Sequence, residues 1–335
     1  MKICIYGAGA IGLLLGARLA ATGRHEVSAV ARGATLAALA EHGFRLAGVD
    51  GNVAGPARAS ADPATLGVQD LVVIAVKAPA LAEVARGIAP LLGPHTVVLP
   101  AMNGVPWWFC QGLAGPAADL ALRSVDPDGS IARNLPVDHV LGCVVHAASF
   151  VSAPGVACTR MGRGLVIGEP RGGLGERVQR LQQVLDEAGF ETTASPLIQR
   201  DIWYKLWGNM TTNPISAITG ATTDRVIADD LVRKLTGDAM LEAGRIGERL
   251  GLAITQTPEE RHQITRKLGA FKTSMLQDVE AGRAIELDSL VGAVRELGRH
   301  VGVETPLIDA IFGLARLFGR VHGLYPGAPA QEHRP

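Results

Sequence analysis

A glycine pattern directly after the first apolar run is the feature that most constrains the fold. The run KICIYG at residues 2–7 ends in Gly7-Ala-Gly-Ala-Ile-Gly12, a GxGxxG pattern, and a helix-like segment follows over 10–22. Between a strand and a helix, the first glycine permits a tight turn, the second lets the backbone approach a pyrophosphate, and the third lets the helix pack closely on the sheet. The sequence therefore predicts a strand–turn–helix that holds a dinucleotide on Gly7, Ala8, Gly9, Ala10, Ile11 and Gly12.

The pattern alone is weak evidence, because the chain has 41 glycines in 335 residues. A glycine-rich turn without a ligand is the alternative interpretation. The setting favours the nucleotide, since a diphosphate there meets unpaired N–H groups and the positive end of the helix dipole. The same N-terminal run is roughly like a signal peptide, but glycines interrupt it and no stop-transfer pattern follows, so we interpret it as a folded segment.

Up to about residue 195, short β-branched runs alternate with helix-like segments. This alternation predicts an open α/β sheet of Rossmann type with right-handed crossovers. Continuous apolar runs bounded by Gly, Pro or charge are expected of parallel strands buried on both faces. The expected strands are 2–7, 25–32, 70–77, 96–104, 140–148 and 163–169, with helices over 10–22 and 174–189.

After residue 196 strand signals nearly vanish and apolar residues recur at helical spacing. We therefore predict a Rossmann-type dinucleotide-binding domain over 1–195 and an all-helical domain over 196–322. The junction falls near TASP at 193–196, and the Pro/Gly-rich tail 323–335 is expected to be disordered. The helices are expected over 197–212, 225–251, 258–281 and 287–302, and near 306–320.

Charge and cysteine usage exclude several classes of function. The 32 basic and 32 acidic residues give zero formal net charge, which argues against a nucleic-acid or anionic-membrane partner. The four cysteines are scattered, so we expect no disulfide framework, no metal site and a reducing cytoplasm. Apolar surface on the second domain is compatible with a homodimer, and the sequence leaves the oligomeric state open.

Three polar residues mark the ends of predicted strands, where doubly wound sheets bind their ligands. At the second strand the sequence offers Arg32 and no acid, which favours NADP(H) because a guanidinium suits a 2′-phosphate. Lys77 and the pair Asn103-Gly104 end two later strands. Each also has an interpretation without a ligand. Arg32 could be a surface arginine, Lys77 could be a solvated strand end, and Asn103-Gly104 could be a turn. Together they predict the floor of a nicotinamide pocket.

The stretch WYKLWGNMTTNP at 203–214 places a polar stripe on an otherwise apolar helix. Lys205 and Asn209 are i and i+4, and Asn213 follows on nearly the same line. A buried ammonium group requires polar or charged neighbours, because its desolvation is otherwise unfavourable. Burial also lowers the pKa of a lysine toward neutrality, which suits a proton donor. A lysine that reaches water is the alternative. Pro214 predicts that the helix kinks or ends near Asn213.

A second polar group lies further along the chain. Ser274 and Asp278 are i and i+4 on one predicted helix, and Glu286 and Asp288 fall at the start of the next. A carboxylate in a first turn also complements the helix dipole, and Asp288 could cap that helix, so these residues alone do not establish a catalytic role.

Five segments together resemble the ketopantoate (2-dehydropantoate) reductase family. The resemblance covers nearly the whole chain in matching order and spacing, and the two longest segments are its most specific part. The segments are GAGAIG at 7–12, VKA at 76–78, NGV at 103–105, WYKLWGNMTTNPISAI at 203–218 and SMLQDVEAGRAIELDSLVG at 274–292.

The resemblance implies a Rossmann domain followed by a helical domain of the 6-phosphogluconate dehydrogenase type, and NADPH-dependent reduction of 2-dehydropantoate to pantoate, a step toward pantothenate and coenzyme A. It implies a catalytic lysine at Lys205, and an acid at Glu286 that helps bind the substrate and stabilises the catalytic arrangement. Asn209 and Asn213 would hold the substrate's oxygens, Ser274 would contact its carboxylate, and Asn103 would also belong to the substrate site. Asn103 would contact lysine and cofactor, and Lys77 and Arg32 the cofactor.

Two alternatives stay open. The chain could reduce another 2-oxo acid, or act as a related β-hydroxyacid or opine-type dehydrogenase, on the same architecture. It could also be a regulator that binds NADP(H) without turnover. The segment 105–139, with Trp107 and Trp108, departs from the simplest members of the family: the two rings could wall the substrate pocket or pack at a subunit interface.

Overall fold

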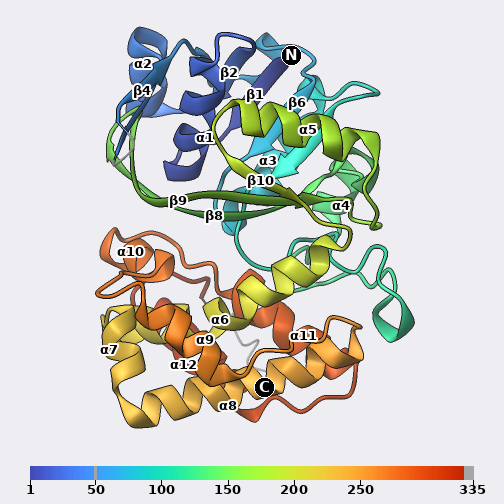
Figure 1. Ribbon diagram of the computed structural model, residues 1–335, viewed down its shortest axis with the longest axis vertical. Helices are drawn as coiled ribbons and strands as arrows, with labels where there is room; N and C mark the ends of the chain where they lie inside the picture. Colours follow the sequence, from blue (N-terminus) through green and yellow to red (C-terminus); the bar gives the residue numbers. More distant parts are fainter. Residues whose placement is uncertain (49–50, 328–335) are drawn as a thin grey trace, which may run out of the picture. The chain divides into compact units, whose positions relative to one another are not determined.

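The computed structural model describes residues 1–48 and 51–327, which fall into two compact units (Figure 1). The first unit comprises Met1–Asn103, Trp107–Gly112 and Asp128–Asp201; the second comprises Gly104–Pro106, Leu113–Pro127 and the chain from Ile202 onward. Residues 1–195 were predicted to form one domain, whereas two stretches of the 104–127 connector group with the second unit and residues 196–201 group with the first. An irregular connector has no periodicity to indicate which core it packs on. The tail 323–335 was expected to be disordered; residues 328–335 lie outside the described residues, but the prediction is wrong for the residues before them, because Leu324 is buried and Tyr325 donates a hydrogen bond to Asp288.

The first sheet is fully parallel, with strand order β5-β2-β1-β6-β7. The chain moves outward from β1 through β2 to β5, and then returns to the other side of β1 through β6 and β7. The order therefore reverses between β1 and β6, where open sheets of this kind bind ligands. The strands are β1 (Lys2–Tyr6), β2 (Glu26–Val30), β5 (Arg58–Ser60), β6 (Leu71–Ile74) and β7 (Val97–Pro100), and the helices between them are α1 (Ala10–Ala21), α2 (Gly33–His42) and α3 (Leu81–Gly87).

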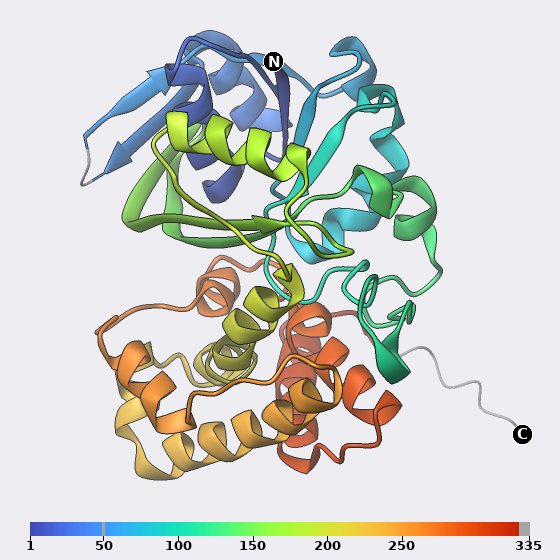
Figure 2. The ribbon, with the colours of Figure 1, turned by 45° about the vertical axis from the view of Figure 1, so that its right-hand side comes forward.

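A second, mixed sheet completes the first unit, and it corrects one expectation. The segments 140–148 and 163–169 were expected in the parallel sheet, but apart from one parallel bridge between Val140 and Val98 of β7 they lie in a long antiparallel hairpin of the second sheet (green in Figure 2). An apolar run indicates a buried strand but does not show which strand it pairs with. The sequence therefore could not show which strands belong to which sheet. The strands are β3 (Phe44–Gly48), β4 (Val53–Gly55), β8 (Gly142–Ala153), β9 (Val156–Gly168) and β10 (Glu191–Ala194), which follows α5 (Glu176–Glu187).

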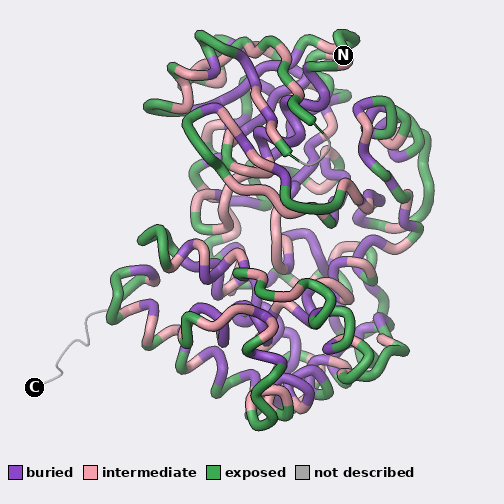
Figure 3. The backbone as a smooth tube through the Cα atoms, turned by 60° about the vertical axis from the view of Figure 1, so that its left-hand side comes forward, coloured by how far each residue is buried: buried purple, intermediate pink, exposed green. Residues whose placement is uncertain are grey.

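Helix α1 packs against strands of both sheets, and every residue from Gly12 to Ala20 is buried. The buried stretches of the chain are purple in Figure 3. A helix that is apolar all round is a buried helix. This explains why the N-terminal run is as apolar as a targeting segment. None of the described helices is both long and apolar enough to cross a membrane.

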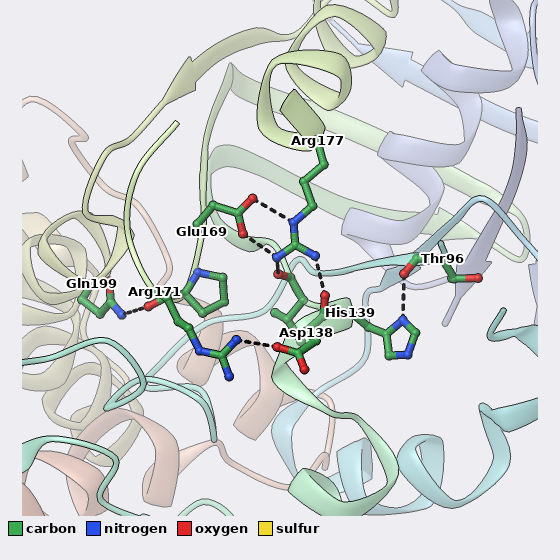
Figure 4. A network of polar contacts seen from close by, with 9 residues as sticks. Thr96, Asp138, His139, Glu169, Arg171, Arg177 and Gln199 are labelled. Atoms are coloured by element: carbon green, nitrogen blue, oxygen red, sulfur yellow. Dashed lines mark hydrogen bonds and ion pairs between the residues drawn. The ribbon is translucent and has the colours of Figure 1, made fainter. Parts of the chain in front are cut away.

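A network at the end of β9 fixes the return of the connector into the first unit (Figure 4). Arg177 of α5 pairs with the Glu169 carboxylate and donates to the backbone oxygens of Asp138 and Val140, the latter over 3.1 Å. Arg171 pairs with the Asp138 carboxylate. Because the Arg177 side chain pairs with the Glu169 carboxylate and also donates to two backbone carbonyl oxygens, it anchors residues 138–140 to α5.

The described part of the second unit is all-helical, as predicted. Two expected helices are each divided: 225–251 forms α7 and α8, and 258–281 forms α9 and α10. The helices are α6 (Ile198–Thr219), α7 (Thr223–Ala228), α8 (Asp230–Arg249), α9 (Pro258–Arg266), α10 (Ser274–Glu280), a π-helix (Asp288–Gly292) that continues into α11 (Ala293–His300), and α12 (Pro306–Val321).

Helix α6 does not end near Asn213; it continues past Pro214 to Thr219. A proline removes one backbone hydrogen bond, but local propensity yields to tertiary packing. The turn before the proline is buried, and the hydroxyl groups of Thr211 and Thr212 both donate to the Gly208 carbonyl oxygen, over 3.0 and 2.9 Å.

Two buried or half-buried carboxylates organise the second unit. Glu296 of α11 accepts hydrogen bonds from the backbone N–H groups of Arg123 and Ser124, both at 2.8 Å, and so holds the connector stretch 113–127. Glu242 of α8 is 3% exposed and accepts from the N–H groups of Leu307 and Ile308, both at 3.0 Å. Glu242 therefore caps the first turn of α12, whose own N-cap residue Thr305 makes no capping bond.

We expect Glu242→Ala to lower the stability of the protein by about 2–3 kcal/mol, because it leaves two N–H groups without their charged acceptor. The measurement is the midpoint of urea unfolding. Glu248→Ala, an exposed carboxylate on the same helix, is the matched control and should change stability by no more than about 0.5 kcal/mol. Equal midpoints for the two variants would contradict the capping role.

Candidate functional site

The three glycines of the first turn have different structural requirements. Gly7 has φ +98°, and a Cβ there would lie 2.5 Å from Val76 Cγ1. A Cβ on Gly12 would lie 2.0 Å from the Gly7 carbonyl oxygen. A Cβ on Gly9 would meet only the Ala75 oxygen, at 3.9 Å. The protein's own packing therefore requires glycine at 7 and 12, whereas at Gly9 it leaves open surface that a ligand backbone or phosphate can approach.

The N-terminus of α1 is suited to an anion. Gly9 occupies the N-cap position and supplies no side-chain cap, and the first turn contains no acidic residue. The first N–H groups of a helix have no intrahelical partner and carry the positive end of its dipole. A diphosphate fits this position, so the residues present fit a dinucleotide.

Lys77 and Asn103 follow neighbouring strands at the same edge. Strand β6 pairs with β1 on one side and with β7 on the other, with Ile74 opposite both Tyr6 and Pro100. Gly7, Lys77 and Asn103 each come one to three residues after these positions. The three therefore lie along one edge of the sheet, at the point where the strand order reverses. Lys77 and Asn103 are both partly buried; their roles stay predictions.

Arg32 follows β2 and forms an ion pair that the sequence analysis missed. Its Nη2 lies 2.5 Å from Glu83 Oε1 on α3, and the side chains are 71% and 57% exposed. The guanidinium holds the pKa of Glu83 below its usual value, and the carboxylate raises the pKa of Arg32. An ion pair this exposed to solvent is weak, so a phosphate could replace Glu83 at little cost. The two residues are 51 positions apart, and no local pattern joins them.

Helix α6 presents Lys205, Asn209 and Asn213 from one uninterrupted helix. Lys205 and Asn209 are partly buried, and Asn213 is 5% exposed. The orientation of the helix is fixed by its apolar side, where Trp207 Nε1 donates to the Met240 carbonyl oxygen over 2.6 Å. The residues buried on that side are Trp203, Leu206, Trp207 and Met210.

Two elements of the same unit carry the remaining predicted residues. Asn213 Nδ2 donates to Ser274 Oγ over 3.4 Å, so the structure brings these two substrate-binding candidates together. Asp278, one turn after Ser274, is 1% exposed and pairs with Arg283 at 3.0 Å, which gives it a structural partner. Glu286 is 4% exposed and directly precedes the first turn of the next helix. That turn leads into a π-helix, a feature frequent at functional sites.

Asp288 does not cap its helix; its carboxylate accepts a hydrogen bond from the Tyr325 hydroxyl at 2.7 Å. Burial raises the pKa of Asp288 above its ordinary value.

Trp107 and Trp108 are 6% and 2% exposed within the first unit, where Trp107 Nε1 donates to the Leu135 carbonyl oxygen over 3.3 Å. Within the described residues no group of His, Cys, Asp and Glu could hold a metal ion.

Known proteins match this chain over both units. The family profile "Ketopantoate reductase PanE/ApbA" matches residues 3–172, and "Ketopantoate reductase PanE/ApbA C terminal" matches 197–318. A 2-dehydropantoate 2-reductase of Mesorhizobium japonicum is 45% identical over 325 residues, which are 97% of this chain and 100% of that protein.

Solved structures agree with this match. The crystal structure of a candidate ketopantoate reductase from Ralstonia solanacearum MolK2 has a TM-score of 0.91 and 51% identity, covering 96% of this chain and 99% of that one. A D-mandelate dehydrogenase in a ternary complex with NADH and anilino(oxo)acetate has a TM-score of 0.80 over 97% of this chain and 100% of that one. Its 21% identity shows a shared fold alone.

We expect Gly9→Ala to weaken dinucleotide binding at least about tenfold, because the methyl group occupies the surface that a diphosphate would approach. Its melting temperature should stay near that of the unaltered protein, since the structure leaves room for that methyl group. Fluorescence titration with NADPH and a thermal melt measure the two effects. Gly12→Ala should instead lower the melting temperature. A Gly9→Ala protein that binds the nucleotide unchanged would contradict the assignment.

Proposed function

The chain belongs to the ketopantoate reductase family and is an oxidoreductase, and on that premise we propose that it reduces the C2 carbonyl of 2-dehydropantoate with NADPH. The product would be (R)-pantoate, a step toward pantothenate and coenzyme A. The observation that carries the proposal is the stripe of Lys205, Asn209 and Asn213 on a helix whose other side is buried. The relative from Mesorhizobium japonicum, named for this reaction, supports the choice of substrate.

The proposed chemistry assigns one task to each side chain. When bound, the nicotinamide supplies the hydride to C2. Negative charge then develops on the carbonyl oxygen, and the Lys205 ammonium both stabilises that charge and donates the proton from Nζ. Asn209, Asn213 and Ser274 hold the substrate's oxygen atoms. Glu286 helps bind the substrate and stabilises the catalytic arrangement.

The cofactor set lies in the first unit. The turn Gly7, Ala8, Gly9, Ala10, Ile11 and Gly12 would hold the diphosphate, and Lys77 and Asn103 would lie beside the nicotinamide half. Arg32 would bind the 2′-phosphate and so give the preference for NADPH over NADH. Glu83 would release Arg32 when that phosphate arrives.

Two alternatives compete with this proposal. The related fold of D-mandelate dehydrogenase keeps open the reduction of a different 2-oxo acid. A panel of 2-oxo acids of increasing size, assayed with NADPH, separates the two; a kcat/KM for 2-dehydropantoate far below about 10⁴ M⁻¹s⁻¹ would favour another substrate. A non-catalytic NADP(H)-binding regulator would turn over none of them. The cytoplasmic location and the homodimer stay predictions.

Lys205→Ala should reduce kcat by about 10²–10⁴-fold, the usual contribution of a positioned general acid, while NADPH binding is retained. Steady-state kinetics and a nucleotide titration on the same preparation measure both quantities. Lys234→Ala, an exposed lysine paired with Asp238 on α8, is the control and should leave kcat unchanged. Unchanged turnover in Lys205→Ala would end the proposed role.

Arg32→Ala should weaken NADPH binding by about 10–100-fold, because it removes charge-assisted hydrogen bonds to the 2′-phosphate. NADH binding should change by much less, since NADH lacks that phosphate. Glu83→Ala removes the other half of the ion pair and should keep the preference for NADPH. Equal weakening of both nucleotides by Arg32→Ala would remove the assignment.

A further inference from the structure

The chain reverses its direction immediately after α12. Gly323 has φ +68°, and the N–H groups of Gly323 and Leu324 donate to the carbonyl oxygens of Arg320 and Gly319, over 3.2 and 2.7 Å. These two bonds form a Schellman motif, which favours a glycine just after the helix because that residue is left-handed. The motif begins a turn at 323–325 in which Leu324 is buried.

The 323–325 turn is bonded to the chain both before and after Glu286. One residue before Glu286, the Ile285 N–H donates to the Leu324 carbonyl oxygen over 3.0 Å. Two residues after Glu286, the Asp288 carboxylate accepts a hydrogen bond from the Tyr325 hydroxyl at 2.7 Å. Consecutive residues of the turn therefore hold the short segment that contains the candidate site carboxylate.

The last turn of α12 fixes the place of Tyr325. A Cβ on Gly319 would lie 2.7 Å from Tyr325 Cβ and 3.0 Å from Ile285 Cδ1, so the glycine leaves the space that both residues occupy. Arg320 Cζ lies 5.9 Å from the centre of the Tyr325 ring, within cation–π range. Arg320 Nε also donates to the Pro326 carbonyl oxygen over 3.1 Å. The tyrosine is therefore held by its neighbours on α12 as well as by its hydroxyl group.

Asp288 is the first residue of the π-helix, and the hydroxyl group of Tyr325 fixes its side chain. The carboxylate is partly buried, and a buried charge requires hydrogen-bond donors. A hydrogen bond to an ionised acceptor is about twice as strong as one between neutral groups. Tyr325 therefore holds the end of the π-helix at which Glu286 lies.

The backbone of Glu286 belongs to the same turn of helix. Its carbonyl oxygen accepts from the Ser289 hydroxyl and the Leu290 N–H, over 3.4 and 3.3 Å. A rotation of that turn would therefore move the Glu286 carboxylate, and a misplacement of about 1 Å can cost about 10²-fold in rate. We infer that Tyr325 is a positioning residue, which holds Glu286 in its working orientation by way of Asp288. This inference rests on the proposed function.

Tyr325→Phe should lower kcat/KM for 2-dehydropantoate by about 5–50-fold and leave the Kd for NADPH unchanged, because it keeps the ring and removes only the bond to Asp288. Steady-state kinetics and a nucleotide titration measure the two quantities. Tyr204→Phe is the matched control: it removes a hydroxyl bond of the same length, 2.7 Å, to Gln256, and should keep kcat/KM. An unchanged kcat/KM in Tyr325→Phe would overturn the inference.

A double-variant cycle separates positioning from a merely structural role. In Glu286→Gln, where the carboxylate is already gone, Tyr325→Phe should cause no further loss of kcat/KM, because both changes act through one group. Asp288→Asn keeps an oxygen that accepts from the hydroxyl and should restore most of the kcat/KM that Asp288→Ala loses. Glu242→Ala, destabilised at its helix cap, should keep kcat/KM. Additive losses from Tyr325→Phe and Glu286→Gln would count against the inference.

Hydrogen exchange tests the same contact without turnover. The Ile285 amide is bonded to the 323–325 turn, so its exchange should be about 2–10-fold faster in Tyr325→Phe than in the unaltered protein, and unchanged in Tyr204→Phe. NMR spectroscopy of the full chain measures it. If no 2-oxo acid is reduced but this difference is seen, the proposed function fails and the positioning of Glu286 stands. Equal exchange in Tyr325→Phe and the unaltered protein overturns the positioning role, whether or not a 2-oxo acid is reduced.

Discussion

The close approach of α1 to the turn before it is the constraint on which the first unit depends. Gly12 packs so near the Gly7 carbonyl that a methyl group would overlap it, and the helix behind it is buried on all sides between two sheets. This packing places the N-terminus of α1 at the edge where the strand order reverses. The same packing that stabilises the core therefore holds a partial positive charge beside Lys77 and Asn103.

In the second unit, the candidate site residues are positioned by the packing of one side of a helix. Here the apolar side of α6 is anchored by Trp203, Trp207 and Met210, and the stripe of Lys205 and Asn209 follows from that anchorage. Sites built on rigid helices hold their side chains more accurately than sites on loops.

Much of this could be predicted from periodicity and turn chemistry. The glycine turn, the strands β1, β2, β6 and β7 and the helical texture after 196 each have a local pattern. The second sheet could not be predicted, since β8 and β9 look like parallel strands until their partners are known. The continuation of α6 past Pro214 required the burial of that turn, which no single segment encodes. The pair Arg32–Glu83 joins residues 51 positions apart, and only the folded chain brings them together.

The connector between β7 and β8 has a consequence for dissecting the molecule. Residues 113–127 belong to the second unit and are held there by Glu296, yet they precede the last stretch of the first unit, Asp128–Asp201, in the chain. A gene fragment truncated after Asp201 would carry that loop without the helix that holds it. A fragment starting at Ile202 would lack it altogether. Neither half is a natural module for expression, fusion or recombination, so exchange of nucleotide-binding halves between homologues would have to move the loop with its helices.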